Sequence, residues 1–343
     1  MLTAVAQERQ LEPRYRRVLA FGEVLDESIS LYRRHWLRFA WVSAIWLLPS
    51  GLVMVWVSTV GLLQTFTALT QVQVGRNLPG TTAQQLASSL ALLGISEVVW
   101  VLFWLGYITS ILVMTDAYIH GTESSLALVF GRTLRAYVHT LVGGLLFALS
   151  FVVLALVATL ILVVPFVDVL LVLAALVGGV LWWTRTVPRT TWLKWLIIIG
   201  MPWGLPTYFS IVWSLFLVAT TVERRGPIDS MRRSAELVHG QWFRVFGIVT
   251  LAWTIVAVLQ LAPSALIQLP LMVSSLTRGQ VMQGAAEQAA SMGVGVLSQV
   301  FFGSVAPIAF TLVFIDLRNR REGVDIAERL SQFEALEPSA IHG

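Results

Sequence analysis

The residues best suited to chemistry lie in one charged stretch, 226–244, between two long apolar runs. It carries Arg232, Arg233 and Arg244, and guanidinium groups form forked hydrogen bonds that match phosphate oxygens. Arg232 and Glu236 have the i, i+4 spacing of a helical ion pair. Two hypotheses follow: a surface helix whose arginines lie near lipid phosphates, or a specific site for an anionic headgroup or a protein partner.

An earlier stretch, 21–38, has the same character and carries Arg33, Arg34 and Arg38. Its apolar residues recur at helical spacing, with charged residues on the other faces. If 226–244 forms a specific site, we expect these three arginines to form its equivalent.

Three acidic residues end apolar runs, namely Asp116, Glu223 and Asp316. We expect them to form ion pairs that fix each run to the basic helix after it; ion coordination or proton relay is the alternative, because carboxylates inside membranes are often functional. Glu97 lies deeper in an apolar run and is the candidate for a transport role.

Recognisable catalytic and metal motifs are missing from the sequence. It has no cysteine, no pair of histidines at ligand spacing, no phosphate-binding glycine loop and no HExxH. We therefore predict no catalytic residue, no metal site and no cofactor.

The composition indicates lipid as the main solvent. Of 343 residues, 57% are hydrophobic and 12% charged, about half the charged share of a soluble domain. The net charge is +4, but the arginines cluster in short segments between apolar runs, as the positive-inside rule describes. We expect membrane lipids as partners, with a cytoplasmic or membrane protein as a further partner, and no nucleic acid.

Apolar runs long enough to cross a bilayer define the expected fold. They cover 39–63, 91–118, 139–164, 245–269 and 293–315, with a further apolar region at 165–222 broken by prolines. We predict an all-α polytopic integral membrane protein. It has about six core transmembrane helices, an extra apolar or re-entrant element within 165–206, and amphipathic interfacial helices on the cytoplasmic side. Polar loops are expected at 64–90 and 270–292.

The distribution of arginine predicts orientation. Seven arginines precede residue 39, whereas the two long polar loops hold one each, Arg76 and Arg278. We therefore expect a multi-pass protein of the inner cell membrane with both termini cytoplasmic.

The chain also contains an internal repeat. At an offset of 206, Ser28, Trp36 and Arg38 align with Ser234, Trp242 and Arg244. At an offset of 200, the run ending at Asp116 aligns with the run ending at Asp316. We predict three parallel units, each an amphipathic helix and two spans. The expected boundaries are an N-terminal tail at 1–20, units at 21–118, 119–223 (with the insertion 165–206) and 224–318, and a C-terminal tail at 319–343.

Three motifs together resemble the membrane domain family named after glycerophosphoryl diester phosphodiesterase. They are Gly22-Glu23-Val24-Leu25-Asp26 near the start, Arg232-Arg233-Ser234-Ala235-Glu236-Leu237 in the third unit, and Asp316-Leu317-Arg318 with Glu322-Gly323 near the end. The Trp- and Pro-rich segment 182–206 is longer than that family's pattern.

The resemblance implies a bacterial membrane domain without the catalytic barrel of the enzyme. We therefore expect a non-catalytic anchor or accessory module that contacts anionic lipid headgroups or a cytoplasmic partner. A transporter of small solutes or lipids is the alternative, and a component of a lipid-headgroup enzyme is a third.

Overall fold

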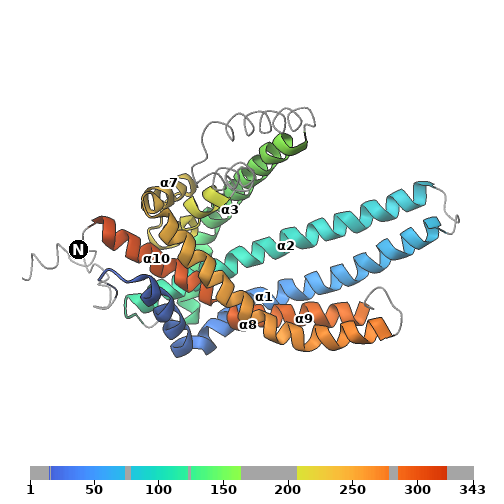
Figure 1. The fold of residues 1–343 in the computed structure, drawn as a ribbon, viewed down its shortest axis with the longest axis horizontal. Helices are drawn as coiled ribbons and strands as arrows, with labels where there is room; N and C mark the ends of the chain where they lie inside the picture. The colour runs from blue at the N-terminus through green and yellow to red at the C-terminus, as the bar shows by residue number, and fades with distance from the viewer. Residues whose placement is uncertain are drawn as a thin grey trace, which may run out of the picture.

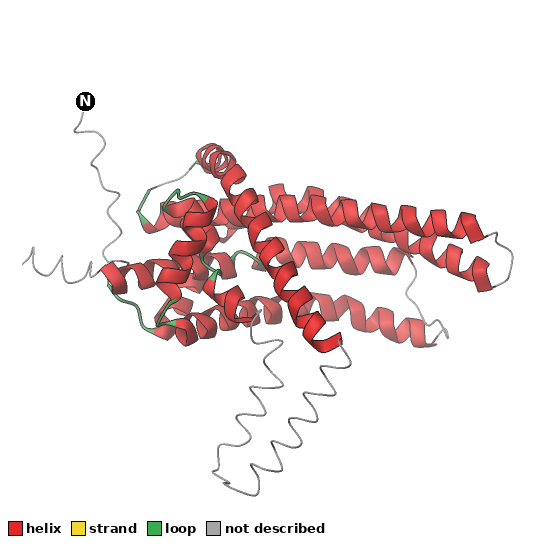
Figure 2. Ribbon diagram, turned by 90° about the horizontal axis from the view of Figure 1, so that it is seen from above, coloured by secondary structure: helices red, strands yellow, loops and turns green. Residues whose placement is uncertain are grey.

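The computed structural model describes residues 15, 17–73, 79–122, 125–163, 207–277 and 285–322, and the regular elements among them are all helices (Figures 1 and 2). One helical turn at 207–212 precedes α6. The named helices are α1 (Phe21–Gln73), α2 (Pro79–Ile119), α3 (Leu126–Val163), α6 (Phe216–Val222), α7 (Pro227–Val238), α8 (Trp242–Thr277), α9 (Ala285–Phe302) and α10 (Val305–Glu322).

Five helical stretches in the described part are long and apolar enough to cross a membrane, which indicates a membrane protein. They are Phe21–Val60, Ala87–Ile119, Leu126–Val153, Trp242–Pro270 and Glu287–Glu322. The expected sixth helix is not among them. Its region yields a shorter apolar helix, Thr207–Val222, and the predicted element within 165–206 lies outside the described residues.

The molecule has one compact end, from which three arms extend (Figure 1). The compact end contains α6, α7 and α10, together with residues 17–20. The arms are the pair α1–α2, the pair α8–α9, and α3. Large apolar side chains on the arms are exposed, for example Leu52 and Leu266, whereas Leu112 and Phe314 are fully buried near the compact end. Exposed apolar surface of this kind suits contact with lipid rather than water.

The expected loops at 64–90 and 270–292 are wrong, because most of these residues are helical. Helix α1 continues to Gln73 and α2 begins at Pro79. Helix α8 continues to Thr277 and α9 begins at Ala285. Glutamine, alanine and leucine favour helix, so the polarity of these segments predicted exposure to water but said little about the backbone.

Helix breaks separate some charged segments from the apolar runs that follow them. His35 interrupts α1 with non-helical dihedral angles (φ −126°, ψ 21°). Gly240 adopts a left-handed conformation (φ 81°) between α7 and α8, which glycine does without steric cost. No such break follows the segment 126–138, which continues directly into the rest of α3.

Close contacts join the first three helices. A Cβ atom on Gly106 would lie 2.4 Å from the Trp46 ring, so only glycine lets this indole pack against α2. The same indole donates a hydrogen bond to Ser110 (2.9 Å), and the Ser110 hydroxyl lies 3.1 Å from that of Thr133 on α3.

Ser234 on α7 forms hydrogen bonds with the backbone at a break in the helical segment that precedes α7. Residues 213–215 form a turn between the helical residues 207–212 and α6. The Ser234 hydroxyl donates to the Val212 carbonyl (2.7 Å) and accepts the Leu215 N–H (3.2 Å). It therefore satisfies a backbone donor and a backbone acceptor in or beside the turn.

The buried face of α7 does not follow its apolar residues. Val238 is fully buried, but Ile228 is 72% exposed, and the fully buried residues include Ser230 and Ser234. Hydrogen bonding to a broken helix decides which face is buried here.

Replacing Ser234 by alanine should lower the free energy of unfolding by about 1 to 3 kcal/mol, because two buried backbone groups lose their partner. The free energy can be measured by titrating a denaturing detergent into protein in a mild detergent. Ser28→Ala is the matched control. Ser28 is equally buried, but its hydroxyl only donates to Val24 in its own helix, a carbonyl that the helix already satisfies. A loss in Ser28→Ala equal to that in Ser234→Ala would contradict this role of Ser234.

Candidate functional site

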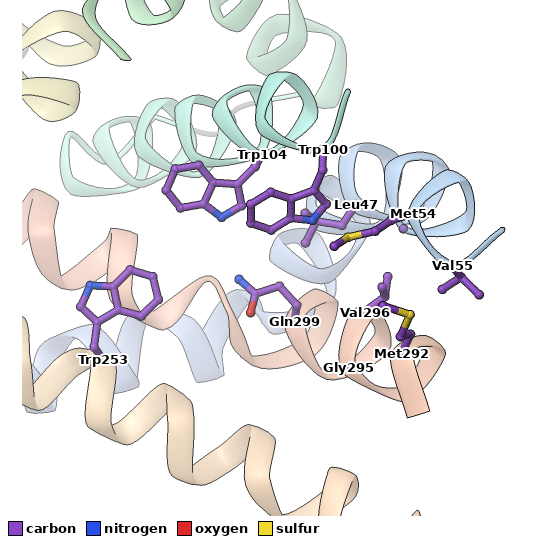
Figure 3. Close-up of a pocket in the computed structure, with 11 residues that line it drawn as sticks. Leu47, Met54, Val55, Trp100, Trp104, Trp253, Met292, Gly295, Val296 and Gln299 are labelled. Carbon is purple, nitrogen blue, oxygen red and sulfur yellow. The ribbon is translucent and has the colours of Figure 1, made fainter. Parts of the chain in front are cut away.

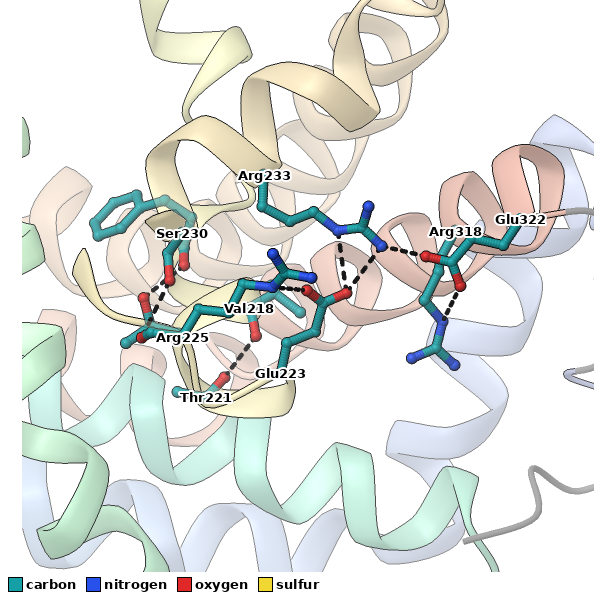
Figure 4. Close-up of polar contacts among 10 residues, drawn as sticks. Val218, Thr221, Glu223, Arg225, Ser230, Arg233, Arg318 and Glu322 are labelled. Atoms are coloured by element: carbon teal, nitrogen blue, oxygen red, sulfur yellow. Dashed lines mark hydrogen bonds and ion pairs between the residues drawn. The ribbon is translucent and has the colours of Figure 1, made fainter. Parts of the chain in front are cut away.

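A chain of five charged side chains connects α6, α7 and α10 at the compact end (Figure 4). Glu223 follows α6 and accepts hydrogen bonds from Arg233 of α7 through two guanidinium nitrogens, at 3.2 and 3.1 Å. Arg225 contacts the other carboxylate oxygen of Glu223 at 2.5 Å. Arg233 also contacts Glu322 of α10, whose carboxylate lies 4.0 Å from Arg318. Arg233 is therefore the link between three helices.

The surroundings of Arg233 keep it charged. Burial lowers the pKa of this guanidinium, but hydrogen bonds to Glu322 and Glu223 outweigh burial and raise the pKa above its ordinary value. The Arg233 side chain is 14% exposed, so most of its hydrogen-bonding capacity is used inside the protein.

Arg232, the preceding residue, has a different environment. Its side chain is 79% exposed and contacts only Glu236 on the same helix, at 3.2 Å. Arg33 and Arg34 of α1 are exposed as well. Arg38 is also exposed, but it donates a hydrogen bond to the Tyr118 hydroxyl.

Arg244 and Asp316 form a second charged network, which includes the backbone of Leu19. The Asp316 carboxylate is 1% exposed and contacts Arg244 (3.0 Å) and Arg320 (2.9 Å). It also accepts the Leu19 N–H (2.8 Å), while both arginines donate to the Leu19 carbonyl. The network joins α8 and α10 to the segment before α1, which was expected to be a tail.

A smaller polar cluster joins α1 to the end of α2. Arg38 donates a hydrogen bond to the Tyr118 hydroxyl (3.3 Å), and His120 contacts the Asp116 carboxylate at 3.2 Å. Burial lowers the pKa of His120, but hydrogen bonds to the Asp116 carboxylate and carbonyl outweigh it and raise the pKa above its ordinary value.

The arms enclose a cavity of about 440 Å³, the tryptophan cavity (Figure 3). Trp100 and Trp104 of α2, Trp253 of α8 and Gln299 of α9 line it together with aliphatic and methionine side chains. The Gln299 amide contacts Gln260. Glu97 is exposed on α2 and is not among the lining residues, so the transport candidate and this cavity are not brought together.

The sequence-based prediction missed a group of basic residues around a larger cavity of about 870 Å³, the arginine cavity. Its basic lining residues are Arg132, Arg135, His139, Arg224 and Arg225. A signal for the first three was present, because the spacing i, i+3, i+7 puts them on one face of a helix.

Within the described ranges, no three side chains of His, Cys, Asp and Glu come together in a way that could hold a metal ion.

Arg233→Gln should lower the free energy of unfolding by about 2 to 3 kcal/mol, because two carboxylates lose a largely buried partner. Arg232→Gln makes the same chemical change one residue earlier, in an exposed pair, and should cost less than about 0.5 kcal/mol. The same detergent titration measures both variants. Equal losses would show that Arg233 does not connect the helices as described.

Asp316→Asn should loosen the segment around Leu19. Trypsin should then cleave after the exposed Arg17 about tenfold faster, because losing charge-assisted hydrogen bonds of about 1.5–3 kcal/mol lowers the free energy of local opening. Mass spectrometry can follow the product that begins at Val18.

The control for this experiment is Asp229→Asn. It makes the same chemical change at an exposed residue of α7, away from Leu19. If trypsin cleaves the Asp316→Asn variant after Arg17 at the same rate as the wild type, the result contradicts the proposed restraint of the N-terminal segment.

Comparisons of the chain with protein-family models, with curated proteins and with solved structures found no match.

Proposed function

We propose that the chain is a non-catalytic membrane module of the glycerophosphoryl diester phosphodiesterase membrane-domain type. It acts as an anchor or accessory unit whose charged end contacts anionic lipid headgroups or a cytoplasmic protein. The observation that carries this proposal is the outward position of Arg33, Arg34 and Arg232. These arginines remain exposed, two in the charged part of α1 and one on α7, while Arg233 and Arg244 serve internal contacts.

The proposed orientation places the compact end in the cytoplasm, with both chain termini on that side and several passes through the inner cell membrane. The excess of arginine at this end supports the orientation. Helix α7 and the part of α1 before His35 are then the amphipathic helices at the interface. In this position, arginine side chains reach headgroup phosphates while neighbouring apolar side chains lie in the acyl region.

A threefold repeat gives this module its proposed architecture, with about six membrane helices. Figure 1 shows the arms α1–α2 and α8–α9 as two pairs of helices. In this proposal the two pairs are copies of one helical hairpin, and α3 belongs to the middle copy. Arg244 contacts Asp316, and its proposed equivalent Arg38 contacts Tyr118, two residues after Asp116. The proposed sixth helix falls largely within residues outside the described ranges.

A lipid-selectivity measurement tests the proposed function. The protein would be reconstituted in mixed vesicles, and its association with spin-labelled phosphatidylglycerol would be compared with that of phosphatidylcholine. We expect the wild type to prefer the anionic lipid and the variant Arg33→Gln/Arg34→Gln/Arg232→Gln to reduce that preference at least about threefold. A basic residue near an anionic surface contributes about 1 kcal/mol, and salt should weaken the effect.

The matched control replaces the same three residues by lysine, which keeps the charge and should retain most of the preference. A triple glutamine variant that prefers phosphatidylglycerol as strongly as the wild type would refute the headgroup role of these residues.

Transport of a small solute or lipid is the second candidate, and the tryptophan cavity is the observation that favours it. The cavity lies between the arms α1–α2 and α8–α9, and indole, thioether and aliphatic groups dominate its lining. Such a lining suits an acyl chain better than a polar solute. Glu97 does not line it, which favours the module over the transporter.

A further inference from the structure

The arginine cavity lies where α3 packs beside α6 and the connection from α6 to α7. Arg132, Arg135 and His139 line it from α3, and Arg224 and Arg225 line it from the connection. Neither group of residues is among the outward arginines of the proposed function. The cavity is therefore a separate basic feature at the same end of the molecule.

The charge of the cavity is strongly positive. Among the described residues, four arginines line it and Asp116 is the one carboxylate that does so. Asp116 is 8% exposed and contacts His120, so it is turned partly toward another partner. Arg225 contacts Glu223, which leaves a net excess of guanidinium charge around the cavity.

Several of the basic groups face the cavity without a partner among the described residues. Arg135, His139 and Arg224 are exposed and make no ion pair or side-chain hydrogen bond there, whereas Arg233 and Arg244 are largely buried in ion pairs. Like charges placed together repel one another, so an arrangement of this kind is stabilised by a bound anion.

Arg224 also has a strained backbone. It is the one non-glycine residue of the described chain with a positive φ, at 54°. A side chain in this region costs about 1 to 2 kcal/mol, and glycine would avoid that cost. Gly226 follows only two residues later, but the strained position is occupied by an arginine whose side chain lines the cavity.

The geometry points to a binding site for a phosphate group, and we propose that the arginine cavity holds a phosphate ester. Arginines from two elements approach one space from different sides, and a phosphate offers oxygen acceptors in several directions. Helix α3 begins at the rim, where its N-terminal N–H groups add positive potential. Val113, Ala136 and Val222 provide an apolar wall for the part of the ligand next to the phosphate.

A direct binding experiment on the full-length protein tests this site. The protein would be purified in a neutral detergent and titrated calorimetrically with inorganic phosphate and with dihexanoyl phosphatidylglycerol below its micelle concentration. The variant Arg135→Gln/Arg224→Gln should weaken binding at least about tenfold, because it removes two charged donors. The control Arg17→Gln/Arg321→Gln removes the same charge from exposed residues that have no part in the proposed headgroup contact, and it should change binding less than about twofold.

The two probes distinguish the source of the phosphate. Tighter binding of the lipid than of inorganic phosphate identifies a lipid headgroup, and equal binding identifies a soluble phosphate compound. Failure of both probes to bind the wild type would overturn the proposal. Binding that Arg135→Gln/Arg224→Gln leaves unchanged, or that Arg17→Gln/Arg321→Gln weakens equally, would also overturn it.

Arg224→Gly separates binding from folding. It removes a cationic group and relieves the left-handed backbone, so phosphate binding should weaken while the thermal midpoint is not lowered. A lowered midpoint together with weaker binding would assign Arg224 a structural role and contradict its role as a ligand. None of Arg33, Arg34 and Arg232 lines the cavity. The lipid selectivity that these three residues are proposed to give can therefore be retained or lost independently of phosphate binding in the cavity.

Discussion

The buried carboxylate of Asp316 is the contact on which the compact end depends. A carboxylate that is 1% exposed must be compensated, and here two guanidinium groups and the Leu19 N–H provide the compensation. The same arginines then satisfy the Leu19 carbonyl. Through these contacts the segment before α1, the start of α8 and the charged half of α10 form one unit. Hydrophobic burial alone would not select this arrangement, because apolar helix faces can pack on one another in many registers.

The arms obey a different constraint. Lipid offers no hydrogen bonds, so polar side chains within apolar helices bond back to their own helix or to a neighbouring one. Thr109 and Thr115 each donate to the carbonyl four residues earlier. Ser43 of α1 and Ser304, between α9 and α10, face each other at 3.0 Å. Few charged contacts therefore restrain the arms, and their relative positions depend on close packing such as that of Gly106 on Trp46.

The sequence was sufficient to predict the helical class, five of the helices that can span a membrane, and helix in the charged stretch 226–244, which the structure divides at Gly240 between α7 and α8. The apolar spans follow from hydropathy, and α7 begins at Gly226 and Pro227, where glycine and proline are favoured; both are local properties. The lengths of α1 and α2 could not be predicted in the same way, since polar residues in a helix that extends beyond the apolar core look like a loop. The buried face of α7 could not be predicted either, because it depends on Ser234 meeting a break in another helix.

The candidate site shows the same limit for charged residues. Arg232 and Arg233 are adjacent and chemically identical, yet one side chain is 79% exposed and the other 14%. Successive residues of a helix point about 100° apart, so the difference depends on where Glu223 and Glu322 lie in the folded chain. The left-handed backbone of Arg224 could not be predicted either, because nothing in the run Glu223-Arg224-Arg225-Gly226 indicates a positive φ at its second residue. A basic stretch in a membrane protein thus combines arginines that hold helices together with arginines that remain available to a ligand, and only their partners tell them apart.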